Sequence, residues 1–214
     1  MQNTLQYLPG MIKATFVAVE VAALGILVSW ILGLALAVMK TAASPLLRWP
    51  AEFFIWFTRG APPLIQVLLI YFGIRQLGVG LTPFVAGVMA LGASSAGFVS
   101  EIVRTGLRAI PKGQWESSTA IGLTSLAAFR RVILPQVVRI IIPSLGNEAI
   151  NTLKNTSLLS AITVVELTLY TQGLVASTFR PFTFYVMAAL IYLVLTTVIS
   201  KAIGWYENKF RLLI

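Results

Sequence analysis

The sequence contains no cysteine, no histidine and no aspartate among its 214 residues. Without cysteine, neither disulfides nor thiol chemistry are available. Without histidine, the chain lacks the commonest metal ligand and the most usual general base near neutral pH. All seven acidic residues are glutamates. These absences argue against a metal site, and we expect no metal and no cofactor in this chain.

Charge is also scarce, because only 11% of the residues are charged while 57% are hydrophobic. A soluble domain carries roughly a quarter charged residues. We therefore predict an all-α integral membrane protein with a single transmembrane domain over residues 1–214. No basic segment with a cleavage site precedes the first apolar run, so no signal peptide is expected.

The net charge of +9 has two readings. A basic chain can bind nucleic acid, but such binding needs a basic soluble domain. Cytoplasmic loops of membrane proteins are enriched in lysine and arginine for a different reason, which is the orientation of the spans. The second reading fits this composition, and no nucleic-acid partner is expected.

Five segments are predicted to cross the membrane. Val21–Met39 is an uncharged run of 19 residues, enough for one span, and its helix is expected to begin near Met11. The other four spans are expected at 57–75, Thr82–Val103, Val137–Leu159 and Pro181–Ser200. Residues 40–50 are read as a loop or amphipathic link, and residues 160–180 as an outer loop or a re-entrant piece.

The distribution of positive charge predicts the orientation of these spans. Eleven basic residues fall on one side: Lys40, Arg48, Arg59, Arg104, Arg108, Lys112, Arg130, Arg131, Lys201, Lys209 and Arg211. Only Lys13, Arg75 and Arg180 fall on the other side, while Arg139 and Lys154 belong to the fourth span. The N-terminus is therefore expected outside the cell, and the C-terminus in the cytoplasm.

A polar, basic stretch from Lys112 to Gln136 separates the third and fourth spans. Gln114–Ile121 and Leu123–Leu134 are each predicted to form a short helix, and Gly122 permits a turn between them. Pro135 is expected to break the second helix. Helical spacing places Arg130 and Arg131 opposite an apolar face made of Leu126, Phe129, Val132 and Ile133. Such a helix–turn–helix unit at a membrane surface is suited to dock into a groove on a soluble partner.

The same stretch contains Glu116-Ser117-Ser118, then Gly122 six residues after the glutamate, then Val132-x-Leu134-Pro135. This pattern resembles the EAA loop of ABC importer membrane subunits. Four flanking motifs are similar to polar amino acid permeases of the histidine and glutamine type: Arg59–Leu64, Ala109–Gln114, Leu134–Gln136 and Leu153–Leu158. The chain departs from the family in Ser117-Ser118, where Ala-Ala is usual, and in Ala61-Pro62, where Thr-Pro is commoner.

This resemblance implies the membrane subunit of an ATP-driven importer in the bacterial cytoplasmic (inner) membrane. The implied substrate is a polar amino acid, and Glu148 and Glu166 without a matching pocket arginine favour a cationic or zwitterionic one. The implied partners are ABC ATPase subunits, a second permease subunit that is identical or homologous, and an external substrate-binding protein. The chain has no phosphate-binding loop of the GxxxxGK[ST] type, so it is not expected to be an enzyme. ATP and magnesium would be held by the ATPase partner.

In the family, the EAA loop is the coupling helix that seats in the ATPase subunit. Carried over by position, the coupling residues are Glu116, Ser117, Ser118, Gly122, Leu123, Phe129, Leu134 and Pro135.

The substrate pocket is expected along the fourth span, where Ser144, Asn147, Glu148, Asn151 and Asn155 form one stripe at three- and four-residue spacing. A stripe of this kind does not face lipid, because a charge at the bilayer centre costs at least about 2.5–3.5 kcal/mol. Glu148 suits the ammonium of an amino acid and Lys154 its carboxylate. Asn151 is a neutral donor and acceptor, and Ser94 and Ser95 of the third span add hydroxyls.

Structural roles compete with these assignments. Glu148 and Lys154 can also pair with each other or at a subunit seam, although a separation of six residues places them on different faces of a straight helix. Glu101 and Arg104, one turn apart, are predicted to form a structural pair, and Arg59 to anchor the second span at the inner surface. Five glycines are suited to close helix packing: Gly25, Gly33, Gly87, Gly92 and Gly97.

Two other functions stay open. The chain could be a small secondary transporter or channel driven by a gradient, with Glu148 as a proton or ion site. It could also be the structural half of a heterodimeric permease, without a working pocket. The docking loop argues against a gradient-driven carrier, which has no use for one.

Overall fold

The computed structural model describes residues 4–209, and this part of the chain folds into helices and forms no strand. The helices are η1 (Thr4–Tyr7), α1 (Leu8–Thr41), α2 (Pro45–Gly60), α3 (Pro63–Gln76), α4 (Pro83–Arg108), α5 (Lys112–Ala120), α6 (Ser125–Ala128), η2 (Phe129–Ile133), α7 (Leu134–Asn155), η3 (Thr156–Ile162), α8 (Leu167–Thr178) and α9 (Pro181–Lys209). Arg211, counted above with the basic tail, lies outside the described residues.

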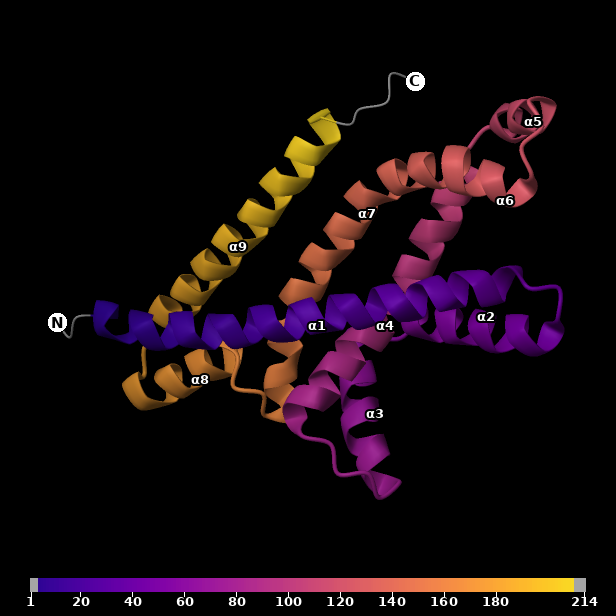
Figure 1. The fold of residues 1–214 in the computed structure, drawn as a ribbon. Coiled ribbons are helices and arrows are strands. Elements are labelled where there is room, and N and C mark those ends of the chain that lie inside the picture. Colours follow the sequence, from indigo (N-terminus) through magenta and orange to yellow (C-terminus); the bar gives the residue numbers. More distant parts are fainter. Residues whose placement is uncertain (1–3, 210–214) are drawn as a thin grey trace.

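The long helix α1 lies across the molecule, with α8 beside its N-terminal end and the α5–α6 unit near its opposite end (Figure 1). Three helical stretches are long and apolar enough to cross a membrane: Leu5–Thr41, Pro83–Arg108 and Pro181–Lys209. Two bent helix pairs raise the number to five if each pair is one span. The first span begins earlier than the predicted Met11, and α9 runs nine residues beyond Ser200.

Close packing of α1 on α4 depends on glycine. A Cβ atom on Gly33 would lie 2.6 Å from Val99 Cγ1, and one on Gly92 would lie 2.5 Å from Val28 Cγ1. Any larger residue at either position would push the two helices apart. Gly25, Gly87 and Gly97 are similarly close to neighbouring side chains, which confirms the prediction for all five glycines.

The predicted second span is not one continuous helix. The chain breaks between Gly60 and Pro63, and α2 and α3 meet at 119°. Consecutive prolines at 62 and 63 cannot donate backbone hydrogen bonds, so the α2 helix cannot continue through them. Residues 40–50 are also not mainly a loop, because α2 begins at Pro45.

Pro135 does not end the second helix of the coupling stretch, as the sequence had suggested. Helix α6 continues through the wider turn η2 into α7, and the whole stretch from Ser125 to Ile162 runs without a break (Figure 1). In η2 the Leu134 N–H donates to the Phe129 carbonyl, five residues earlier. This π-type turn lets the helix pass a proline that has no N–H of its own.

Residues 160–180 are largely helical and are not an open loop; their bend fits a broken span or the predicted re-entrant piece. Helix α8 occupies Leu167–Thr178 and follows the preceding helix at a bend of 51°. Glu166 caps α8 by accepting hydrogen bonds from the N–H groups of Thr168 and Leu169, at 2.8 and 2.9 Å. Its carboxylate also accepts from the Tyr192 hydroxyl at 3.0 Å, which ties α8 to α9.

Candidate functional site

A pocket of about 270 Å³ lies between the end of α2, the second half of α4 and the middle of α7. Its lining consists of Arg59, Phe98, Glu101, Ile102, Thr105, Gly106, Ile140, Ile141, Ser144 and Glu148. Glu148 and Ser144 therefore face a cavity, as the polar stripe on the fourth span had predicted. Glu148 is partly buried, and its carboxyl has the Ser95 and Asn151 side chains as polar neighbours.

The other predicted pocket residues do not line this cavity. The Ser94 hydroxyl is buried and donates to Gln66 Oε1 at 2.9 Å, while Ser95 lies 2.9 Å from the Thr152 hydroxyl. Asn151 and Lys154 are exposed on α7. No ion pair joins Glu148 to Lys154 within residues 4–209, so the competing pairing inside one chain is not observed.

Arg59 is the cation that the structure brings to the pocket and that sequence reasoning had assigned only to anchoring. It ends α2 and lies over the Phe98 ring, with its guanidinium carbon 5.7 Å from the ring centroid. No glutamate within the described ranges forms an ion pair with it. The available signal was its position directly before the Gly60-Ala61-Pro62-Pro63 break, where the helix has to end.

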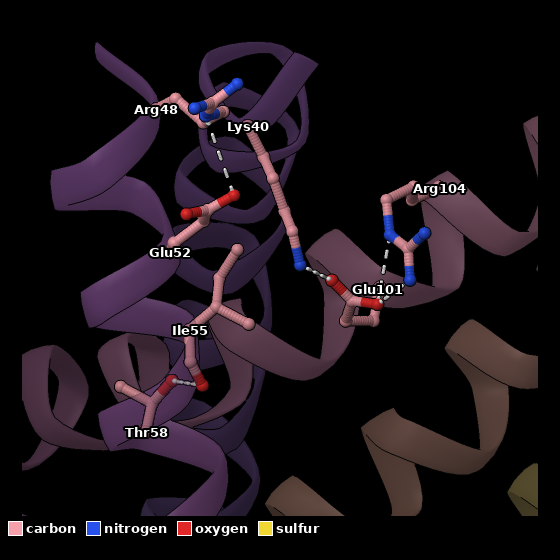
Figure 2. Close-up of polar contacts among 7 residues, drawn as sticks. All are labelled: Lys40, Arg48, Glu52, Ile55, Thr58, Glu101 and Arg104. Atoms are coloured by element: carbon pink, nitrogen blue, oxygen red, sulfur yellow. Dashed lines mark hydrogen bonds and ion pairs between the residues drawn. The ribbon is translucent and has the colours of Figure 1, made fainter. Parts of the chain in front are cut away.

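The Glu101 carboxylate, in contrast, forms ion pairs with two cations, Lys40 and Arg104 (Figure 2). One carboxylate oxygen lies 2.7 Å from Lys40 Nζ, and the other accepts from Arg104 Nε at 3.0 Å and from the Arg104 terminal nitrogen. The predicted Glu101–Arg104 pair is confirmed, and Lys40 adds a link from α1 to α4 that the sequence did not reveal. Of the charged residues that line the pocket, Glu148 and Arg59 are thus the two without an ion-pair partner among residues 4–209.

The stretch between α4 and α7 has the predicted helix–turn–helix form. Gly122 has φ of +82°, a conformation that residues with a side chain rarely adopt, and no atom crowds it. Thr124 caps the following helix by accepting from the Ala127 N–H at 3.3 Å. The Trp115 and Phe129 rings stack with centroids 6.5 Å apart, which holds α5 against η2.

The apolar face of the second helix packs mostly inside this chain. Phe129, Val132 and Ile133 belong to a core cluster with Val137, whereas Leu126 is 66% exposed. The free apolar surface is therefore the tip of the unit, where Ile121 is 76% exposed beside Leu126. The inner part of this face serves the core of the chain, because α7 continues from the helix and carries that face inward.

The residues assigned to coupling separate into two groups. Glu116 and Ser117 are exposed on α5, Gly122 forms the turn and Leu123 follows it half-buried. Ser118 is buried and donates to the Gln114 carbonyl at 2.6 Å. Phe129 and Leu134 instead line an apolar groove beside α1, and Pro135 is exposed in the first turn of α7.

The side chains that line the Glu148 pocket suit reversible binding of a small dipolar ligand. The pocket contains one free carboxylate, one free guanidinium and an aromatic ring. Within residues 4–209, no group of three or more His, Cys, Asp or Glu side chains is placed to hold a metal ion.

Comparisons with known proteins agree with this architecture. Residues 8–212 match the family described as "Binding-protein-dependent transport system inner membrane component". The chain is 35% identical to the probable glutamine ABC transporter permease protein GlnM of Bacillus subtilis, over 85% of this chain and 84% of that protein. It is also 35% identical to the arginine ABC transporter permease protein ArtQ of Escherichia coli K12, over 93% of this chain and 95% of that protein.

Solved structures of ABC transporters contain chains with the same fold. The crystal structure of an amino acid ABC transporter with histidines contains a chain that superposes with a TM-score of 0.91, at 35% identity and 96% coverage of both chains. An inward-facing MetNI methionine ABC transporter shares the fold, with a TM-score of 0.78 at 18% identity.

Proposed function

The chain belongs to the family of binding-protein-dependent transport system inner membrane components, and we propose that it imports a polar amino acid together with ATPase partners. It is an amino acid ABC permease subunit of the inner membrane and carries no ATPase motif of its own.

The observation that carries the substrate class is the isolated pair of charges in the pocket. Glu148 suits the α-ammonium of an amino acid, and Arg59 suits its α-carboxylate because a guanidinium fork binds carboxylates in two places. Glu101 is not available for a second cation while Lys40 and Arg104 hold it. The arrangement favours a zwitterion over a ligand with an extra positive charge. Lys154 stays a prediction for the carboxylate, since its exposed position fits a contact made across to a second subunit.

Asn151 and Ser95 support Glu148 in this proposal. Both are polar neighbours of its carboxyl, so they hold it in place beside the pocket. Ser94 keeps its assignment as a hydroxyl of the site, although in this structure it donates to Gln66.

The α5–α6 tip is proposed to seat in an ATPase subunit. Exposed Ile121, Leu126 and Glu116 give it an apolar centre with a charged edge. A second permease subunit would cover the exposed polar stripe of α7, which a lipid environment would otherwise disfavour. A substrate-binding protein would deliver the amino acid from outside.

The pocket assignment is tested with ligand chemistry and reconstituted transporter. Wild-type protein should take up the amino acid and discriminate against its α-carboxamide, because a neutral carboxamide offers no charge to the Arg59 guanidinium at the edge of the pocket. Arg59→Gln should lose most of this discrimination, while Glu148→Gln should keep it and lower the uptake of both ligands.

Lys154→Gln is the matched control, since it removes a charge from the same region without lining the pocket. If Arg59→Gln keeps full discrimination against the carboxamide and Lys154→Gln loses it, then Lys154 and not Arg59 binds the carboxylate of the ligand. Restored uptake in the double variant Glu148→Gln with Lys154→Gln would show that these two residues only pair with each other. Uptake that persists without ATPase and ATP but collapses with an ionophore would favour a gradient-driven carrier.

A further inference from the structure

A second cavity, of about 550 Å³, lies between α1, α4 and α7 and shares one wall residue, Ile141, with the Glu148 pocket. On one side it is walled by Trp30, Leu34 and Val38, and on the other by Leu134, Val138 and Ile142. Apart from the Thr41 hydroxyl and the Trp30 indole, the lining has no polar side chain. We call this cavity the α1–α7 groove.

The groove opens to the surroundings of the chain. Val38 is 70% exposed and Leu34 is 52% exposed, and both lie on a helix long and apolar enough to cross the membrane. A water molecule needs two to four polar partners to be held in a cavity, and this lining does not supply them. In a membrane, hydrocarbon is therefore the medium that fills it.

Two arginines, Arg130 and Arg131, follow directly in sequence from Phe129, a lining residue at one end of the groove. Thr41 and Phe129 line that end, where α1 stops and η2 passes. Arg130 and Arg131 belong to the same η2 turn, are exposed, and form no ion pair with any glutamate in the described part of the chain. Lys40, the last basic residue of α1, is already engaged by Glu101.

We propose that the α1–α7 groove binds an anionic phospholipid, with an acyl chain along α1 and α7 and the phosphate held by Arg130 and Arg131. Basic clusters at the end of a membrane helix attract anionic headgroups, and the arginine fork binds phosphate oxygens in two places. An electrically neutral lipid fills the groove equally well but gains nothing from the arginines. The combination of apolar groove and free cations therefore selects for the anionic class.

The position of this lipid would matter for movement. Phe129 belongs to η2, the turn that joins the α5–α6 unit to α7, and it lines the groove together with Ala37 of α1. A lipid lodged there contacts both α1 and the turn, so its departure or replacement changes the packing between them.

The test uses the full chain in native membranes, with a photo-crosslinking phenylalanine in place of Val38. The control position is Val194, which is 62% exposed on α9 and does not line the groove. After irradiation, the mass of the denatured chain identifies each adduct. We expect phosphatidylglycerol or cardiolipin adducts at Val38 to be enriched about fivefold or more over those at Val194, as attraction by a basic residue near the surface predicts.

Arg130→Gln with Arg131→Gln should reduce this enrichment to the Val194 level, while crosslinking at Val194 itself reports that the variant is still inserted. The matched control removes two charges elsewhere, with Lys112→Gln and Lys201→Gln, and should keep the enrichment. Equal anionic shares at Val38 and Val194 would overturn the proposal. So would an adduct at Val38 with twice the mass of the chain, which would place a second copy in the groove.

Discussion

At the scale of single residues, Gln66 does the most to shape the site. Its side chain is 2% exposed and donates to the carbonyls of Thr58 and Ala61, at 2.9 and 2.8 Å. Thr58 would normally receive the N–H of residue 62 in a helix, but proline has none. Gln66 therefore supplies the donor that the helix break removes, and its Oε1 accepts from Ser94. This arrangement fixes the end of α2, where Arg59 lies.

We predict that Gln66→Leu strongly destabilises the chain. The buried Thr58 carbonyl, the partly buried Ala61 carbonyl and the buried Ser94 hydroxyl would lose their partner, and each fully buried group costs about 1–3 kcal/mol. Ser94→Ala removes only one bond, with a smaller effect of about 1 kcal/mol. Thermal unfolding of the purified protein in detergent measures both variants. Equal shifts for the two would contradict a role for Gln66 in holding the break.

Single residues also show where sequence reasoning stops. Gly122 and the Glu101–Arg104 pair were predictable, because a turn glycine and a pair one helical turn apart are local patterns. Glu148 was predictable because its stripe is periodic along one helix. The contacts of Arg59 with Phe98 and of Lys40 with Glu101 were not predicted, since Phe98 and Glu101 lie on another helix, α4. Contacts between distant segments leave no periodic signal in one sequence.

At the scale of elements, the continuity of α6, η2 and α7 is the main departure from the sequence prediction. Proline is usually read as the end of a helix, but a π-type turn removes the conflict. The consequence is mechanical, because the α6 tip and Glu148 lie on one unbroken helical stretch. A displacement of the tip would be carried along α7 to the pocket, which suits a coupling unit.

We predict that Gly122→Val uncouples ATP hydrolysis from transport. Valine resists a φ of +82°, so the turn and the position of the tip would change while the spans stay intact. Uptake should fall sharply in reconstituted transporter at normal membrane abundance. Gly113→Val is the control, because Gly113 has an ordinary φ and open space around it. Wild-type uptake by Gly122→Val, or an equal loss in both variants, would contradict a special role for this turn.

At the scale of the whole molecule, composition and apolar runs predicted the class well. They predicted an all-helical membrane protein, and the described residues are helical, with a short helix–turn–helix unit between α4 and α7. The 119° break between α2 and α3 was not predicted, because hydropathy records apolar length and not direction. Helix α9 also makes few internal contacts, and only Phe184 and Ala188 are buried within it. Much of its surface is therefore available to lipid or to another subunit.

The orientation of the chain in the membrane is the last prediction, and it follows from charge and from shape together. The α5–α6 unit and α8 lie at opposite ends of the molecule (Figure 1). Basic residues gather at the α5–α6 end, which the positive-inside rule assigns to the cytoplasm.

A cysteine in place of Ser125 should then react with an impermeant thiol reagent only in inside-out vesicles, and one in place of Ser177 only from outside. Both serines are exposed, and the chain has no native cysteine to interfere. Reaction of both cysteines from the same side would contradict the separation of the two ends, and the opposite pattern would reverse the orientation. A cytoplasmic α5–α6 tip is what allows the ATPase partner to reach it, so the expected pattern links the fold to its source of energy.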